Sequence, residues 1–351
     1  MFAEALSPEQ LTPPQLDAYL EKGWFRMGQT IFTTNFIHFK SEIYSAIWLR
    51  ILLEEYIADH THVKLAKSNS KFKATIQRTV ISAEKEALYA KYKQSLPFQT
   101  SDSLHHLLFG RTETPSIYTT YEVTLYEGEK LIACGFFDVG ETSAEGIVSF
   151  YDPEYKKYSL GKYLIYLKIQ YCQELKLRYF YTGYFVPGYS YFDYKLTIAK
   201  PALYYLQLSS QQWLPIASFS DAHIPYLVAY DKLKQVQQLL APVSPQTRVM
   251  KYEYFDANLI PELKQTDLLD FPVFLFHDQG EEDDINLIIV FDVRDDQYHL
   301  LSCIPYWIPK EKNPDTDFYS DYFLKAVYEV YATPSEEMMS HAFLQLLSKK
   351  K

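Results

Sequence analysis

The sequence predicts an α+β fold in which helices flank an antiparallel or mixed β-sheet. Between residues 117 and 151, apolar and polar residues alternate with a period of two, which is typical of half-buried strands. From Leu160 to Leu175, apolar residues recur at spacings of three, four and seven and so form one face of an amphipathic helix. An aromatic segment at residues 179–185 follows and has the composition of a strand.

Length and composition limit the class of protein. The chain has 351 residues, 48% of them hydrophobic, enough for one large or two ordinary domains. Only 11 residues are glycine, which argues against an enzyme built on a glycine-rich nucleotide loop. No apolar run approaches the ~20 residues of a membrane-spanning helix, and the first residues lack the pattern of a signal peptide. Three isolated cysteines, Cys134, Cys172 and Cys303, indicate buried thiols in a reducing compartment, so we expect a cytoplasmic protein.

The charge is distributed unevenly. The net charge is -10, which by itself argues against a nucleic-acid partner. Residues 60–93, however, contain 8 basic and 2 acidic residues, whereas the chain from Lys251 onward contains 9 basic and 20 acidic residues. The basic segment could meet a phosphate backbone, or it could be an ordinary solvated loop and helix face.

The first 110 residues contain sequence patterns that mark the N-termini of helices. Thr12 and Gln15 form a capping box, with proline in the first helical turn. Ser82 can cap a second helix, with Glu84 and Glu86 in its positive first turn. The predicted elements are a helix at 15–22, a strand at 30–33, a strand or short helix at 42–52 (we favour the strand), a helix from 82 to 94 and a helix at 103–109.

The middle of the chain has the strand and helix order of a GNAT-type acyltransferase core. Strands are predicted at 118–126, 131–139 and 146–151, and a helix capped by Ser159 follows before the strand at 179–185. In that fold the helix points its N-terminus, and its free backbone N–H groups, at the acyl donor. Other α+β sandwiches share this order of elements.

The remaining residues predict a further α+β region. Strand-like segments occur at 252–254, 273–277, 285–293 and 298–304, with a charged hairpin tip at 280–284 and a loop at 309–317. Helices are predicted at 231–240, 322–330 and 335–347.

Five short motifs carry a family resemblance. In order they are Tyr151-Asp152-Pro153, Ser159-Leu160-Gly161, Gly183-Tyr184-Phe185, Tyr194-Lys195 and Pro201. This order resembles the C-terminal domain of the arginyl-tRNA–protein transferase family, which includes the bacterial aspartate/glutamate leucyltransferases. The similarity covers about residues 17–205 and includes the early segment with Arg26. It implies three regions: an N-terminal α+β region at 1–110, a GNAT-like aminoacyl-transferase core at 111–215, and a C-terminal extension of unknown role at 216–351.

The resemblance implies a reaction and its partners. The family moves arginine or leucine from aminoacyl-tRNA to the N-terminal amine of proteins that begin with Asp or Glu, which marks them for degradation in the N-degron pathway. The ester is already activated, so such an enzyme mainly aligns two reactants, accepts a proton and stabilises an oxyanion. No cofactor is expected.

The resemblance also implies site residues. The proposed catalytic residues are Asp152, Tyr151 and Tyr194, with Asp152 orienting or deprotonating the incoming amine. The substrate-binding residues are Arg26, Ser159, Leu160, Gly161, Gly183, Tyr184 and Lys195. Backbone amides at residues 159–161 would hold the terminal adenosine or its phosphate, Tyr184 and Tyr194 would line the acyl pocket, and Lys195 and Arg26 would bind an acidic side chain or a phosphate. A turn-forming Asp, packing tyrosines and surface cations are the alternative interpretations.

The sequence departs from the family at several positions. The segment 33–39 lacks the cysteines found there in relatives, so the metal or cluster they serve is expected to be absent. Only Arg26 remains of a paired arginine, and Tyr191-Phe192 replaces a Lys-Met pair. Two alternative functions therefore remain: an N-acyltransferase that uses acetyl-coenzyme A, and a non-catalytic binding module. The pairs His60/His62 and His105/His106 lack a third ligand at metal-site spacing and are predicted to be loop histidines.

Overall fold

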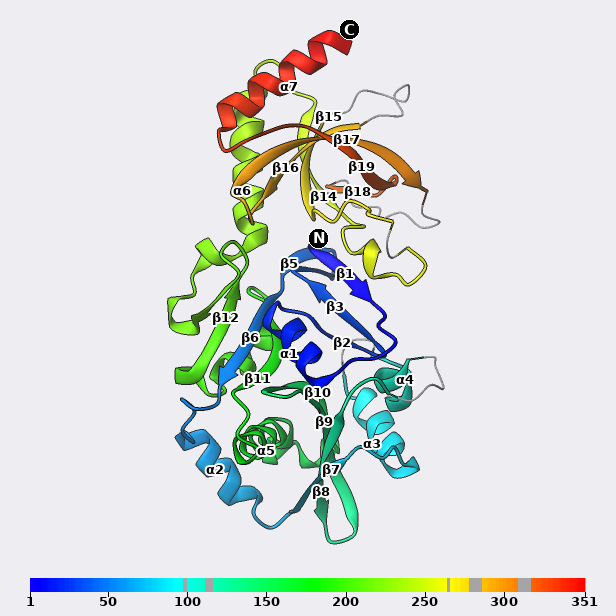
Figure 1. Cartoon of the computed structure of the whole chain (residues 1–351), viewed down its shortest axis with the longest axis vertical. Helices are drawn as coiled ribbons and strands as arrows, with labels where there is room; N and C mark the ends of the chain where they lie inside the picture. Colours follow the sequence, from blue (N-terminus) through cyan, green and yellow to red (C-terminus); the bar gives the residue numbers. More distant parts are fainter. Residues whose placement is uncertain (97–99, 111–115, 264–265, 278–285, 309–316, 351) are drawn as a thin grey trace.

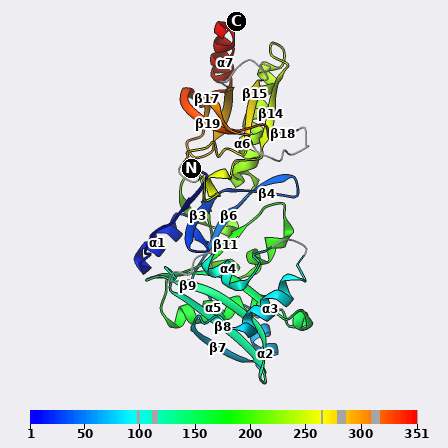
Figure 2. The same cartoon turned by 90° about the vertical axis from the view of Figure 1, so that its right-hand side faces the viewer.

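The chain forms an elongated molecule whose two ends are built on different β-sheets (Figure 1). This computed structural model describes all residues except 97–99, 111–115, 264–265, 278–285, 309–316 and 351. Both views place the N-terminus at the junction of the two parts (Figure 2).

The lower part is organised by an eight-stranded mixed sheet with the order β13-β12-β6-β11-β10-β9-β8-β7. Its strands are β6 (Ile47–Leu52), β7 (Lys73–Arg78), β8 (Thr120–Glu127), β9 (Lys130–Val139), β10 (Ser143–Tyr151), β11 (Tyr179–Phe185), β12 (Leu203–Gln207) and β13 (Gln212–Pro215). All pairs are antiparallel except β10 and β11, which helix α5 (Leu160–Glu174) connects. Three antiparallel strands, a helix and a parallel strand confirm the predicted α+β fold with a GNAT-like core.

The two parallel strands separate after a short pairing. β10 and β11 pair only at residues 143–145 and 179–181. Immediately afterwards β10 changes register against β9 between Gly146 and Val148, and β11 changes register against β6 between Tyr181 and Gly183. These bulges bend the strands apart, so the sheet forks beside the N-terminus of α5.

Helices cover both faces of this sheet. α5 packs against β8, β9 and β10, and its buried Leu164 and Ile169 share a core with Ala133 and Phe137 of β9. α3 (Ala83–Lys93) and α4 (Leu104–Phe109) bury Leu88 and other residues against the opposite face of β9.

The sequence predicts many of these elements and misses others, among them helix α2 (His60–Asn69) and strands β12 and β13. Helices at 15–22, 82–94 and 103–109 are confirmed as α1 (Pro13–Glu21), α3 and α4, and the strand at 30–33 is confirmed as β3 (Thr30–Thr34). The favoured strand at 42–52 is two strands, β5 (Glu42–Ser45) and β6, separated by Ala46. The histidine pairs do not lie in loops: His60 and His62 belong to α2 (His60–Asn69) and His105 and His106 to α4. Asp59 precedes the missed helix α2, and its side chain caps the helix by accepting a hydrogen bond from His62 N.

Short sheets link the N-terminus to the rest. β1 (Ala3–Leu6), β3 and β2 (Phe25–Met27) form a three-stranded sheet, and β4 (Phe36–Phe39) pairs with β5 in a hairpin. Phe2, Phe36 and Ile43 from this region are buried in the core of the upper part. The N-terminal residues therefore join the two parts of the molecule.

The upper part contains a six-stranded sheet with the order β18-β14-β15-β16-β17-β19. Its strands are β14 (Thr247–Tyr252), β15 (Val273–His277), β16 (Asn286–Asp292), β17 (Gln297–Trp307), β18 (Phe318–Tyr319) and β19 (Phe323–Thr333). Helices α6 (Pro225–Leu240) and α7 (Glu336–Lys350) pack against it (Figure 2).

Several predictions for this region need correction. The helix predicted at 322–330 is wrong, because this segment is strand β19 and pairs along its length with β17. Pairing outweighs local pattern here, since the apolar and aromatic residues of the segment also suit a strand. The strand predicted at 252–254 lies earlier, as β14, and the helix predicted at 231–240 begins six residues earlier, at Pro225. The hairpin tip at 280–284 and nearly all of the loop at 309–317 lie outside the described residues.

The division into regions 1–110, 111–215 and 216–351 stays a prediction. The first two regions share one sheet, because β6 and β7 pair with strands of the core. None of the described helices is long and apolar enough to cross a membrane. The three cysteines are buried and free.

Candidate active site

A cavity of ≈ 640 Å³ lies where β10 and β11 separate, beside the N-terminus of α5. Residues 146–149 of β10 and Phe180 and Thr182 of β11 line two of its sides. Four lysines also line it, and none of the described lining residues is Asp or Glu: Lys156, Lys162, Lys168 and Lys195. The cavity, hereafter the cleft, therefore favours an anionic ligand.

The start of α5 presents backbone N–H groups to the cleft. Tyr163 N bonds back to Ser159 O at 3.1 Å, so the preceding amides lie in the first turn, where no helical acceptor is available. Ser159 and Gly161 both line the cleft. The prediction that the Ser159 side chain caps the helix is wrong: Ser159 has φ 52° and makes no capping hydrogen bond with its side chain. Leu160 lies in the core, so only its backbone amide belongs to this turn.

Lys195 enters the cleft from the short helical segment that follows β11. Its Nζ donates a hydrogen bond to Tyr184 O at 2.7 Å and lies 5.4–5.5 Å from the ring centroids of Phe192 and Tyr184. Burial among these groups lowers the pKa of Lys195 to about 7. Gly183, with φ +81°, lies beneath this amine, and a Cβ there would come within 3.1 Å of Nζ. Gly183 thus leaves room for Lys195.

Two of the predicted tyrosines face the same cavity. Tyr151 lines the cleft beside Gly161, whose added Cβ would meet the Tyr151 ring at 3.5 Å. Tyr194 also lines the cleft and is 44% exposed, so its ring is available for stacking on a ligand. The structure therefore brings Tyr151, Ser159, Gly161, Tyr194 and Lys195 together.

Asp152 does not line the cleft. Its carboxylate is 2% exposed and pairs with Lys91 Nζ at 2.7 Å and Lys130 Nζ at 3.0 Å. It also accepts a hydrogen bond from Glu154 N and so caps the turn at Pro153–Tyr158 that leads into α5. Burial acts to raise the pKa of Asp152, but the two lysines outweigh it and hold the pKa below its ordinary value. Asp152 fixes the path of the chain into the site, and its role in proton transfer stays a prediction.

Arg26 lines neither of the two cavities described here and is almost completely buried. Its Nη1 donates to Asp138 at 3.0 Å and to Thr120 Oγ1 at 2.8 Å. Its Nε donates to Gly28 O at 2.8 Å, and Nη2 donates to Leu108 O. Arg26 therefore joins β2 to strands β8 and β9 of the core sheet, and its binding of substrate stays a prediction.

Sequence analysis did not single out Lys168. This residue lies on the buried face of α5, and its Nζ donates to Phe136 O at 2.8 Å, Val148 O at 3.0 Å and Ser149 Oγ at 3.1 Å. Burial lowers its pKa to about 7. The bonds to β9 and β10 lie at the bulge that opens the fork. The sequence does contain a signal for this residue: Lys168 comes four residues after Leu164 and therefore lies on the apolar face of the predicted helix.

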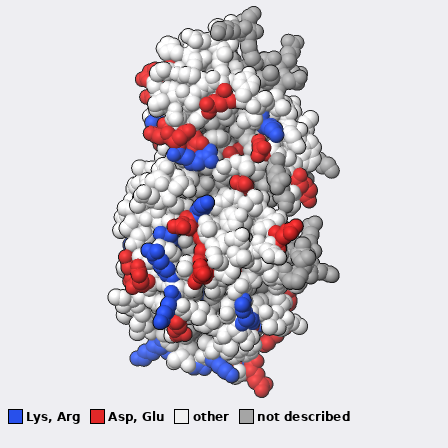
Figure 3. All heavy atoms as spheres, in the orientation of Figure 1, with Lys and Arg blue, Asp and Glu red and all other residues white. Residues whose placement is uncertain are grey.

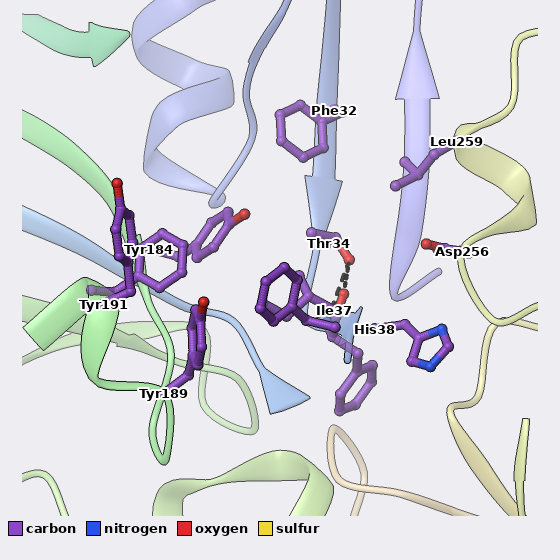
Figure 4. Close-up of a pocket in the computed structure, with 12 residues that line it drawn as sticks. Phe32, Thr34, Ile37, His38, Tyr184, Tyr189, Tyr191, Asp256 and Leu259 are labelled. Carbon is purple, nitrogen blue, oxygen red and sulfur yellow. Dashed lines mark hydrogen bonds between the residues drawn. The ribbon is translucent and has the colours of Figure 1, made fainter. Parts of the chain in front are cut away.

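A second cavity of ≈ 330 Å³ lies at the junction of the two parts of the molecule (Figure 4). The segment 33–39, which lacks the family's cysteines, contributes Thr34, Phe36 and His38 to its wall. Tyr184, predicted to line the acyl pocket, lines this cavity. Tyr191 and Phe192 line both cavities, so the two share a wall.

The histidine pairs do not assemble a metal site. His62 accepts or donates a hydrogen bond at 2.7 Å to Tyr56 OH and stacks on Tyr166. Among the described residues, a group of three possible metal ligands with atoms within 4.8 Å of one another lies in the upper part, and it consists of Asp292, Asp295 and His299. Arg294 already pairs with Asp292, and Glu329 with His299.

The forked mixed sheet and the amide-presenting start of α5 define a GNAT-like acyltransferase core. Solved structures resemble the chain only at low TM-scores: FemX matches at 0.33 and 9% identity, covering 54% of this chain and 64% of that one. A tandem GNAT protein from the clavulanic acid biosynthesis pathway matches at 0.30 and 11% identity, covering 56% and 57%. The description of the core as GNAT-like follows from its own strand order.

Sequence comparisons identify the family. The profile described as "Arginine-tRNA-protein transferase, C terminus" matches residues 84–204. An aspartate/glutamate leucyltransferase of Leptospira interrogans is 31% identical over 192 residues, which cover 54% of this chain and 73% of the relative. Enzymes of the same name from Campylobacter jejuni and Vibrio cholerae are 28% and 26% identical, over 50% and 60% of this chain and 74% and 87% of their own. The chain belongs to the arginyl-tRNA–protein transferase family.

Proposed function

We propose that this protein transfers an amino acid, arginine or leucine, from aminoacyl-tRNA to the N-terminal amine of another protein. The observation that carries the proposal is the cleft itself. It combines the free amides of a helix start with four lysines, and no carboxylate is found among its described lining residues. The 3′ end of a tRNA is an anionic chain that ends in an adenosine, and exposed Tyr194 offers a ring for its base.

The chemistry needs alignment more than activation. The acceptor's α-amine, with a pKa of about 8, keeps a usable neutral fraction near neutral pH. Its nitrogen attacks the ester carbonyl, the C–N bond forms and the ester C–O bond breaks. The nitrogen loses a proton, and the ribose hydroxyl leaves with one. The amides at residues 160 and 161 and the ammonium of Lys195 supply hydrogen-bond donors for the phosphate or the developing oxyanion.

Lysine and arginine side chains extend the basic surface around this part of the molecule. On the face shown in Figure 3, most of them lie over the lower part, which contains the large sheet. The basic segment at 60–93 contributes α2, β7 and α3 to the same part. A phosphate backbone would be attracted there although the net charge of the whole chain is -10.

The acceptor and the compartment are further parts of the proposal. Relatives named aspartate/glutamate leucyltransferase support acceptors that begin with Asp or Glu, and tagging of such proteins would place the enzyme in the N-degron pathway. Three free, buried thiols are compatible with a reducing compartment, and we therefore place the activity in the cytoplasm.

A transfer assay tests the proposal. The protein is incubated with labelled arginyl-tRNA, leucyl-tRNA or acetyl-coenzyme A, and with a peptide that begins with Asp or a matched peptide that begins with Gly. We expect label from at least one aminoacyl-tRNA to appear on the Asp peptide and not on the Gly peptide. Label from acetyl-coenzyme A alone would indicate an N-acetyltransferase, and the absence of label from every donor would indicate a binding module.

A further inference from the structure

The second cavity has an unusual combination of lining groups. Seven of its lining residues are aromatic: Phe32, Phe36, Phe39, Tyr184, Tyr189, Tyr191 and Phe192. Its volume of ≈ 330 Å³ lies within the range of small-ligand sites, about 300–1,000 Å³. In Figure 4, Tyr184, Tyr189 and Tyr191 lie on one side and Asp256 and Leu259 on the other. The wall therefore combines rings from the core with a carboxylate from the C-terminal region.

The carboxylate of Asp256 lacks a compensating cation. No lysine or arginine of the described chain forms an ion pair with it, since Lys251 pairs with Glu42 at 3.0 Å and Lys40 lies over the ring of Phe39. Burial raises the pKa of Asp256, the charge of His38 opposes this change, and the nearby carboxylate of Glu253 adds to it. A partly buried carboxylate without such a partner gains stability from a cationic ligand.

The neighbouring polar atoms point to the same conclusion. His38 Nε2 and Glu253 Oε2 are buried and have no hydrogen-bond partner among the described residues. His38 also lines the cavity. Aromatic faces attract cations through their quadrupoles. A cation on a flexible apolar stem would contact both the rings and the carboxylate.

We propose that the second cavity binds the side chain of the amino acid being transferred, that it favours a cationic side chain such as arginine or lysine over leucine, and that Asp256 determines this preference. The inference depends on the proposed function. It assigns a role to the C-terminal region, because Asp256 lies outside the residues 84–204 that match the family profile.

The shared wall explains why the occupant belongs to the donor. Tyr191 and Phe192 line both cavities, and Lys195 in the cleft bonds to Tyr184 O, whose residue lines the second cavity. An ester held at the start of α5 therefore lies in the cavity that borders, across this shared wall, the one proposed for its side chain. An acidic acceptor side chain would be repelled by Asp256, so the acceptor does not suit this cavity.

The preference is measured with four donors. Initial rates of transfer to the Asp peptide are compared for arginyl-, lysyl-, leucyl- and phenylalanyl-tRNA. We expect arginine and lysine to be transferred at least about tenfold faster, because one buried charge pair contributes about 1.4 kcal/mol or more. Asp256→Asn should remove this advantage and leave leucine transfer nearly unchanged. Glu262→Gln is the matched control, because it makes the same change in charge at an exposed position of the same region.

Binding of free amino-acid amides separates this inference from the proposed function. Argininamide and leucinamide are titrated into the full chain while the melting temperature is followed. Stabilisation by argininamide alone, abolished by Asp256→Asn and retained by Glu262→Gln, supports the inference even if no tRNA-dependent transfer occurs. Equal effects of the two amides, or faster transfer of leucine than of arginine by the wild type, would overturn it.

Discussion

Replacement of Lys195 by alanine is the sharpest test of the cleft. In the structure Nζ gives one hydrogen bond to Tyr184 O at 2.7 Å, which leaves two N–H groups for a ligand. A hydrogen bond from a charged group to a ligand contributes about 1.5–3 kcal/mol. If the two remaining donors together contribute about 3 kcal/mol, Lys195→Ala lowers kcat/KM for transfer by about 150-fold.

The same substitution should leave the fold nearly unchanged. It removes one hydrogen bond, which contributes about 1 kcal/mol to stability. It also removes the unfavourable desolvation of the Lys195 amine. The melting temperature should therefore change by only a few degrees. The assay compares kcat/KM and thermal unfolding for the wild type, Lys195→Ala and Lys200→Ala, an exposed lysine that does not line the cleft. A Lys195→Ala variant that folds normally and transfers at a nearly normal rate would refute the role of Lys195.

The pKa of Lys195 adds a dependence on pH. Because burial lowers this pKa to about 7, the free protein loses the positive charge of Lys195 as the pH rises through 7. The dissociation constant for deacylated tRNA should therefore rise across this range, and the rise should be smaller in Lys195→Ala. Binding is the better measurement here, since transfer also gains from deprotonation of the acceptor amine over the same range.

Two further predictions concern stability. Arg26→Ala leaves Asp138 buried and unpaired, so the free energy of unfolding in urea should fall by about 3–5 kcal/mol. Lys71→Ala is the control, because Lys71 forms an exposed ion pair with Glu127 and its loss should cause no measurable change. Similar stability of the two variants would contradict the structural role of Arg26. Between pH 7 and 8.5 the unfolded chain keeps the proton of Lys168 while the folded protein releases it, because the pKa in the folded state is about 7. Stability should therefore rise with pH in this window by up to about 1.4 kcal/mol per pH unit, and by less in Lys168→Met; equal slopes would show that Lys168 is not buried as described.

The sequence predicts the local elements better than the contacts between them. The amphipathic spacing from Leu160 to Leu175 and the alternation before it predict α5 and strands β8 to β10, because both patterns are local in the chain. The local pattern at 322–330 predicts a helix, whereas the segment belongs to strand β19, because its pairing with β17 depends on residues far away in the chain.

The sequence likewise predicts some residues of the candidate site but not the contacts between distant segments. Gly161 and Lys195 belong to two of the five motifs that occur in the same order as in the family, and both residues line the cleft. The pairing of Asp152 with Lys91 and Lys130 could not be predicted, because the three residues come from separate segments. The sequence does not predict the second cavity either, since its wall combines segments around residues 36, 190 and 256.

A structure of the protein bound to an aminoacylated adenosine with a non-hydrolysable amide in place of the ester tests the central claim most directly. The account predicts that the adenosine lies at the start of α5, beside Gly161 and Tyr194, with the acyl carbonyl near Lys195 Nζ. An analogue bound elsewhere, with the cleft empty, would contradict it.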